Sequence, residues 1–295
     1  MAFFQKKTTL VHNITYMALM TAINLIFIVL DRFVPLLIFV LVFVLPFASA
    51  IVSYYCQKKY YIIYALANIA LCFIFFESIF YIVPAICSGF VIGLLLEKRI
   101  HPFWMLLSST IIEASLSIAF IPLINVVTHT DIIETTFAIF KLQSFSYKAD
   151  LMYLAIFFVA LTQCTITHFV LLTEIKKLGI ETYTRVASFG PYIIGLQLSL
   201  IIGLILALTY SPLSHTFIAI SFYFAVFLMI DIATCKKPLI YLCIGILFVV
   251  AFFLYVLMYS KMVEPLGFVW FSLFPLAVAI TSFVKNYLLK YESNI

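Results

Sequence analysis

The sequence predicts an all-α integral membrane protein, a polytopic bundle of about eight to ten transmembrane helices. Of its 295 residues, 66% are hydrophobic, 18% are aromatic and only 10% are charged. So few charges could not cover the surface of a soluble domain of this length. The apolar residues also occur in runs of roughly 20 residues, the length that a helix needs to cross a bilayer core.

Ten apolar runs of suitable length follow one another along the chain. They cover residues 12–30, 33–55, 60–82, 84–96, 102–124, 151–173, 189–209, 215–235, 238–259 and 266–284. The first is expected to be a retained span, because no small-residue cleavage site ends it. Residues 60–96 are too long for one perpendicular helix and short for two. We expect a break there at Pro84 and Gly89, since proline removes a backbone donor.

The basic residues predict the topology. If the N-terminus is cytoplasmic, thirteen of the 17 lysines and arginines fall inside and four outside, in agreement with the positive-inside rule. The inside set is Lys6, Lys7, Lys58, Lys59, Lys98, Arg99, Lys176, Lys177, Arg185, Lys236, Lys237, Lys285 and Lys290. We therefore expect a multi-pass membrane protein with both termini cytoplasmic. The net charge of +5 then faces anionic lipid, and no nucleic-acid partner is expected.

The longest polar stretches divide the chain. Residues 125–150 are predicted to lie outside, either as an amphipathic surface segment or as an ordinary linker, because apolar residues recur there at near-helical spacing. Residues 174–188 are predicted to be a cytoplasmic linker. It separates an N-terminal membrane bundle, residues 1–173, from a C-terminal part of four spans, residues 189–295.

Placing an ionisable side chain inside a membrane costs free energy, so each such residue calls for a structural or functional explanation. Glu113 lies about 11 residues into its span, roughly 16 Å deep at the helical rise, near the midplane. Ser109 and Ser117 are one turn before and after it, on the same helical face. Glu77 falls toward the outer end of another span, and Asn24 adds an intramembrane amide. These five residues are the candidate solute-binding set. For Glu113, solute or proton binding competes with a neutral packing role.

Motifs of common enzymes are absent from the sequence. It contains no GxxxxGK[ST], HExxH or GxSxG, and its six cysteines are scattered singly without metal-ligand spacing. We therefore expect no ATPase activity, no catalytic residue, no metal site and no cofactor, and we do not expect an enzyme.

In the first span, Ala18 and Ala22 form a small-xxx-small pair near the cytoplasmic end, a spacing that permits close helix approach. A charged start followed by this alanine pair resembles the first helix of substrate-binding (S) subunits of energy-coupling factor (ECF) transporters. The resemblance implies that Ala18 and Ala22 dock on a transmembrane coupling subunit. Those S subunits usually have six spans, fewer than are expected here.

Residues 12–125 also resemble the YybS-like membrane proteins of Gram-positive bacteria, which are plausible distant relatives of ECF S subunits. The matching stretches are Val34 to Leu37, Leu45 to Phe47, Gln57 to Lys59 and Gly89 to Arg99. Together, these resemblances imply the substrate-binding subunit of an ECF-type importer of a small, vitamin-like solute. They imply that it works in a bacterial cell membrane with a coupling subunit and separate ATPases. The alternatives are a non-transporting scaffold for envelope assembly and a proton-coupled secondary transporter that uses Glu113.

Overall fold

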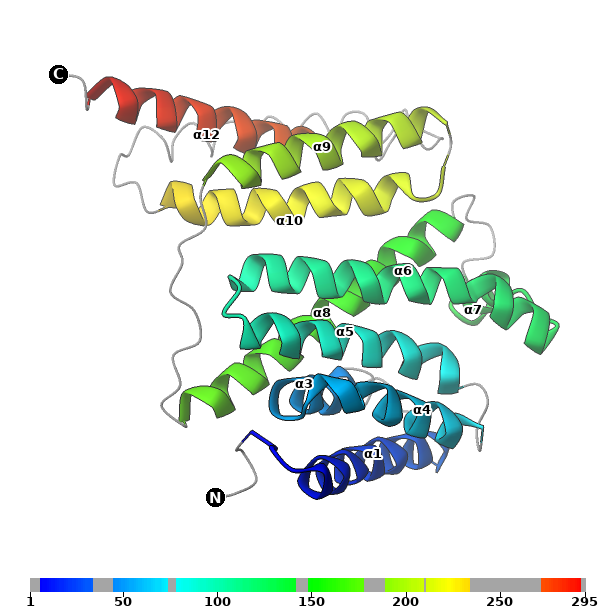
Figure 1. The fold of residues 1–295 in the computed structure, drawn as a ribbon. Helices are drawn as coiled ribbons and strands as arrows, with labels where there is room; N and C mark the ends of the chain where they lie inside the picture. The colour runs from blue at the N-terminus through cyan, green and yellow to red at the C-terminus, as the bar shows by residue number, and fades with distance from the viewer. Residues whose placement is uncertain are drawn as a thin grey trace. The chain divides into compact units, whose positions relative to one another are not determined.

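The computed structural model is all-α, as the sequence predicts (Figure 1). It describes residues 6–33, 45–73, 78–141, 148–177, 189–209, 211–233 and 272–292. Within these residues every regular element is a helix. The chain divides into two compact units. Unit 1 comprises residues 1–140 and 155–186, and unit 2 comprises residues 141–154 and 187–295. The predicted linker falls close to this division, but residues 141–154 group with unit 2.

Unit 1 is a bundle of helices packed side by side (Figure 1). Helix α3 packs along α5, α5 packs along α6, and α1 contacts both α3 and α4. The elements are α1 (Leu10–Phe33), α3 (Leu45–Tyr55), the 3-10 turn η3 (Lys58–Tyr60), α4 (Tyr61–Cys72), α5 (Ile79–Glu97), α6 (Pro102–Thr128), α7 (Ile132–Ile139) and α8 (Lys148–Lys177). The first seven residues of α8 belong to unit 2.

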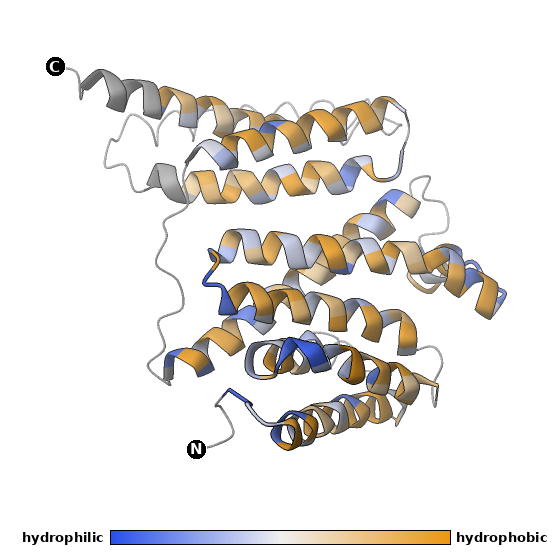
Figure 2. Ribbon diagram, in the orientation of Figure 1, coloured by the Kyte–Doolittle hydropathy of each residue, from blue (hydrophilic) through white to orange (hydrophobic). Residues whose placement is uncertain are grey.

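Five of the described helices are long and apolar enough to cross a membrane, which confirms a multi-pass membrane protein. They cover Leu10–Leu30, Ile79–Glu97, Pro102–Thr128, Lys148–Lys176 and Gly190–Leu208. These helices are hydrophobic over most of their length, whereas the segment before α1 and the connection from α5 to α6 are hydrophilic (Figure 2). The expected span at residues 238–259 lies outside the described residues.

The expected break at Pro84 and Gly89 is wrong. Helix α4 ends at Cys72, and α5 begins at Ile79 and continues through Pro84. A proline removes one backbone donor, and an apolar membrane helix can tolerate that loss when neighbouring groups compensate. Gly89 and Gly93 instead allow α5 to pack closely against α3. A Cβ at Gly89 would overlap the carbonyl oxygen of Pro46, and one at Gly93 would overlap the Ser53 hydroxyl, so both let α3 lie directly against α5.

One end of unit 1 gathers three of the basic segments. Lys6 Nζ, before α1, lies 2.7 Å from Glu97 Oε1 at the end of α5. Lys58 Nζ, between α3 and α4, lies 4.0 Å from Glu97 Oε2. The Asn13 side chain accepts a hydrogen bond from the Gln57 backbone N–H at 2.8 Å. This bond holds the start of α1 against the turn between α3 and α4. The three segments that the charge distribution places on one side of the membrane therefore meet at one end of the bundle.

Capping residues set the ends of α6 and α7. The ring of His101 accepts a hydrogen bond from the Phe103 N–H, and Pro102 opens α6, where a missing N–H costs nothing. His129 ends the helix in the left-handed conformation, at φ 53°. The Asp131 side chain then caps α7 by accepting hydrogen bonds from backbone N–H groups in the first turn of that helix. The periodic apolar pattern in residues 125–150 thus does form a short helix, with Phe137 buried.

Unit 2 contains α9 (Phe189–Leu208), α10 (Ser214–Ala233) and α12 (Leu273–Glu292). A Cβ at Gly195 would overlap the ring of Phe224, so this glycine lets α9 approach α10 closely. His215 Nδ1 lies 2.7 Å from Asp150 Oδ1, which attaches the first turn of α8 to the start of α10. Neither residue is distinguished by a motif in the sequence.

Candidate functional site

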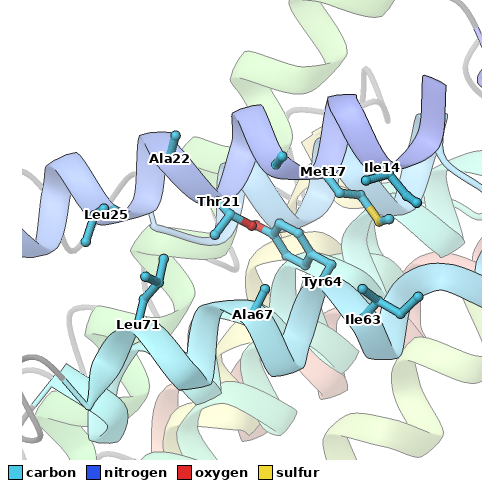
Figure 3. Close-up of a pocket in the computed structure, with 10 residues that line it drawn as sticks. Ile14, Met17, Thr21, Ala22, Leu25, Ile63, Tyr64, Ala67 and Leu71 are labelled. Atoms are coloured by element: carbon cyan, nitrogen blue, oxygen red, sulfur yellow. The ribbon is translucent and has the colours of Figure 1, made fainter. Parts of the chain in front are cut away.

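An open groove runs between α1 and α4 on unit 1 (Figure 3). Its volume is about 370 Å³. The lining residues are Ile14, Met17, Ala18, Thr21, Ala22, Leu25, Ile63, Tyr64, Ala67 and Leu71. Both predicted docking residues, Ala18 and Ala22, are exposed and contribute to this groove.

The shape of the groove follows from side-chain size. Ala18 and Ala22 on α1 and Ala67 on α4 are exposed and end at Cβ, so they leave the helix backbones accessible. Thr21 and Tyr64 are largely buried and lie between the two helices, where Figure 3 shows the Tyr64 ring reaching toward Thr21. Small residues of this kind allow a further membrane helix to approach closely.

A buried polar network joins α1 to α4. The Asn24 amide donates to Asn68 Oδ1 at 2.8 Å and to the Tyr64 hydroxyl at 3.1 Å. Asn68 donates in turn to Thr21 Oγ1 at 3.2 Å, and Ser49 of α3 lies 3.4 Å from the Tyr64 hydroxyl. In an apolar surrounding such bonds hold helices at a defined separation. The network therefore fixes the width of the groove. It also gives the intramembrane amide of Asn24 a structural role.

A second buried polar cluster surrounds Glu113. This side chain is 3% exposed, and the Cys164 thiol of α8 donates to its Oε2 at 3.2 Å. Ser88 of α5 lies near the carboxyl group and Ser109 lies near Cys164, while each serine hydroxyl donates to a backbone carbonyl of its own helix. The cluster thus joins α5, α6 and α8 through one carboxyl group and neutral donors. A carboxyl group in such a place can hold a proton or accept a cationic group of a ligand.

The predicted solute-binding residues fall into different places. Glu113 and Ser109 lie together in the second cluster, whereas Asn24 has its partners on α4 in the first. Ser117 is half-exposed one turn further along α6. Glu77 lies outside the described residues. The described members of the set are therefore divided between different places in unit 1.

Several members of these clusters were not identified as site residues from the sequence. In the sequence Cys164 is one of six scattered cysteines, and Asn68 is a single amide within an apolar run. Helical periodicity places residues on a face of their own helix, but it does not identify the residue on the facing helix. Only the depth of each polar residue in its span could have selected candidates such as Asn68.

Comparison with protein-family models, curated proteins and solved structures gives no match to this chain. No group of three or more potential metal ligands occurs among the described residues. The site must therefore be interpreted from its own geometry.

Proposed function

We propose that the chain is the membrane-embedded solute-binding subunit of an ECF-type importer and that it carries no ATPase of its own. One observation supports this above all: Ala18 and Ala22 are exposed and line an open groove on α1. The resemblance of the first helix to ECF S subunits assigns these alanines to docking on a coupling subunit. The groove is a surface of the kind that such docking requires.

The geometry of the groove favours a helix as its occupant. Helix association within lipid gains little from the hydrophobic effect and depends on close van der Waals packing, which small residues on facing walls permit. Ala18, Ala22 and Ala67 supply them from two helices. The network of Asn24, Asn68 and Tyr64 keeps these walls apart without a partner, so the surface is preformed.

In this proposal the solute binds through Glu113 and its neighbours. Among the described Asp and Glu side chains, Glu113 is the most buried, and it has neighbours on two other helices of unit 1, Ser88 and Cys164. A small solute with a cationic group would be held by the carboxylate and oriented by the hydroxyl and thiol groups. Because the sequence contains no P-loop, ATP hydrolysis must come from other chains.

Co-purification tests the proposal. The full chain should co-purify with a coupling subunit and ATPases, and the double variant Ala18→Leu/Ala22→Leu should lose them, because branched side chains hold the helices apart. Ala119→Leu is the matched control, since Ala119 is an alanine on α6 outside the groove. If no ATPase accompanies the wild-type chain, or if the double variant assembles as well as the control, the proposal is wrong. Absence of ATPases would favour a scaffold.

A second candidate is a proton-coupled secondary transporter. It is favoured by the burial of Glu113 among neutral partners, which is the environment of an intramembrane proton carrier. Uptake into proteoliposomes containing the purified chain alone distinguishes the two functions. A secondary transporter accumulates solute when a proton gradient is applied, whereas an ECF subunit without ATPases does not.

A further inference from the structure

Six cationic side chains meet at the end of unit 1 where α1 begins. They are Lys6, Lys7, Lys58, Lys59, Lys98 and Arg99. Two contacts bring three separate segments together there, because Lys6 and Lys58 both approach Glu97. Arg99 also interacts electrostatically with Tyr54 at the end of α3. Cations from the segment before α1, from η3 and from the α5–α6 connection therefore form one basic end.

Few carboxylates offset this charge. Glu97 is engaged by Lys6 and Lys58, and Glu174, at the end of α8, acts electrostatically on Tyr55. Within the described residues, Lys59, Lys98 and Arg99 form no ion pair, and all three are exposed. The basic end thus presents positive charge that its own carboxylates leave largely uncompensated.

Three of these cations lie over tyrosine rings. Lys6 Nζ stands 4.7 Å from the ring centre of Tyr54, Lys7 Nζ 4.6 Å from that of Tyr16, and Lys59 Nζ 4.8 Å from that of Tyr60. Tyr16 and Tyr54 are buried in the protein, whereas Tyr60 is half-exposed, and exposed tyrosines gather at the membrane–water interface. All the cations also lie within a few residues of a helix end. Both features place the basic end at the level of lipid headgroups.

We propose that the basic end binds the headgroup of an anionic phospholipid, through Lys59, Lys98 and Arg99. The phosphodiester meets the exposed cations, while the acyl chains lie along the apolar helices that begin there. Charge complementarity at headgroup depth supports this occupant, since each lysine or arginine near an anionic membrane surface contributes about 1 kcal/mol. The proposal does not depend on the solute, on the coupling subunit or on which side of the membrane the basic end faces.

Spin-labelled lipids provide the test. The full chain is reconstituted in phosphatidylcholine, and the immobilised fraction of spin-labelled phosphatidylglycerol is compared with that of spin-labelled phosphatidylcholine. The wild-type protein should prefer phosphatidylglycerol, and Lys59→Gln or Lys98→Gln should each weaken that preference by up to about fivefold. The matched control is Lys141→Gln, which removes an exposed lysine beyond α7. Melting temperatures of the purified variants verify that each is folded.

Three results would overturn the proposal. Equal association of the two labelled lipids with the wild-type protein would exclude a headgroup site. An equal loss in Lys141→Gln would show that only net charge matters. Displacement of labelled phosphatidylglycerol by soluble glycerol phosphate at a similar concentration would identify a site for a free anion instead of a lipid.

Discussion

The Cys164 thiol lies 3.2 Å from Oε2 of Glu113 and joins α8 to α6 in the interior of unit 1. Ser88 adds a contact from α5, so a single carboxyl group is shared by three helices. A residue in this position affects both packing and any ligand that reaches it, and the two roles can be separated by substitution.

Glu113→Gln retains size and hydrogen bonding but removes the charge and the titratable proton. If the carboxylate binds a cationic solute, we expect uptake by the complete transporter to fall at least tenfold, about the effect of losing one charge-assisted hydrogen bond. The melting temperature should change little. Full uptake by the variant would assign Glu113 to packing. Uptake that persists but no longer depends on pH would favour the secondary transporter.

Gly93→Ala tests the packing of α3 on α5. The added Cβ would overlap the Ser53 hydroxyl and the backbone oxygen of Ala50, so the helices must separate. Overpacking of this kind destabilises by about 1–3 kcal/mol. Gly190→Ala is the control, because a Cβ there meets no atom within 4 Å. Thermal unfolding in detergent should show a lower melting temperature for Gly93→Ala alone, and equal melting of the two variants would contradict the close approach of α3 to α5.

Asn68→Leu removes the centre of the network between α1 and α4. The variant leaves the Asn24 amide and Thr21 without this partner, and we expect a loss of about 1–2 kcal/mol in the free energy of unfolding. Tyr64→Phe should cost less, since Asn24 keeps its bond to Asn68. Chemical unfolding in micelles measures both. A larger loss in Tyr64→Phe than in Asn68→Leu would assign the central role to the tyrosine.

His101 should make stability depend on pH. Burial lowers the pKa of this histidine, which precedes the α6 span, below its ordinary value of 6.5. Its neutral ring accepts a hydrogen bond from the Phe103 N–H, and protonation of the ring nitrogen removes that acceptor. Below pH 6.5 the unfolded state binds more protons than the folded state, so this contribution to stability is complete above pH 6.5 and decreases as the pH falls.

His101→Asn provides the comparison, because asparagine caps a helix without titrating. Melting temperatures of the wild-type protein and the variant, measured from about pH 8 to about pH 5, should diverge on the acid side, with the wild type losing more. Parallel curves would show that the ring of His101 contributes no pH dependence.

The sequence predicted the class of fold and the positions of most helices. Long apolar runs correspond to α1, α6, α8 and α9, because a bilayer requires about 20 apolar residues whatever the helix packs against. The polar stretch after α6 contained a helix, as its spacing indicated. The break near Pro84 was misplaced, since proline and glycine have local preferences that close packing and an apolar environment override.

By itself, the sequence determined a polytopic all-α membrane protein, because composition and run length are properties of the chain alone. It also identified Ala18, Ala22 and Glu113 as residues that required explanation. Tertiary structure alone decided their partners: a groove with α4 for the alanines, and Cys164 and Ser88 for the carboxyl group. The physical reason is that helical periodicity assigns each side chain to a face of its own helix, whereas the packing of different helices decides which faces meet.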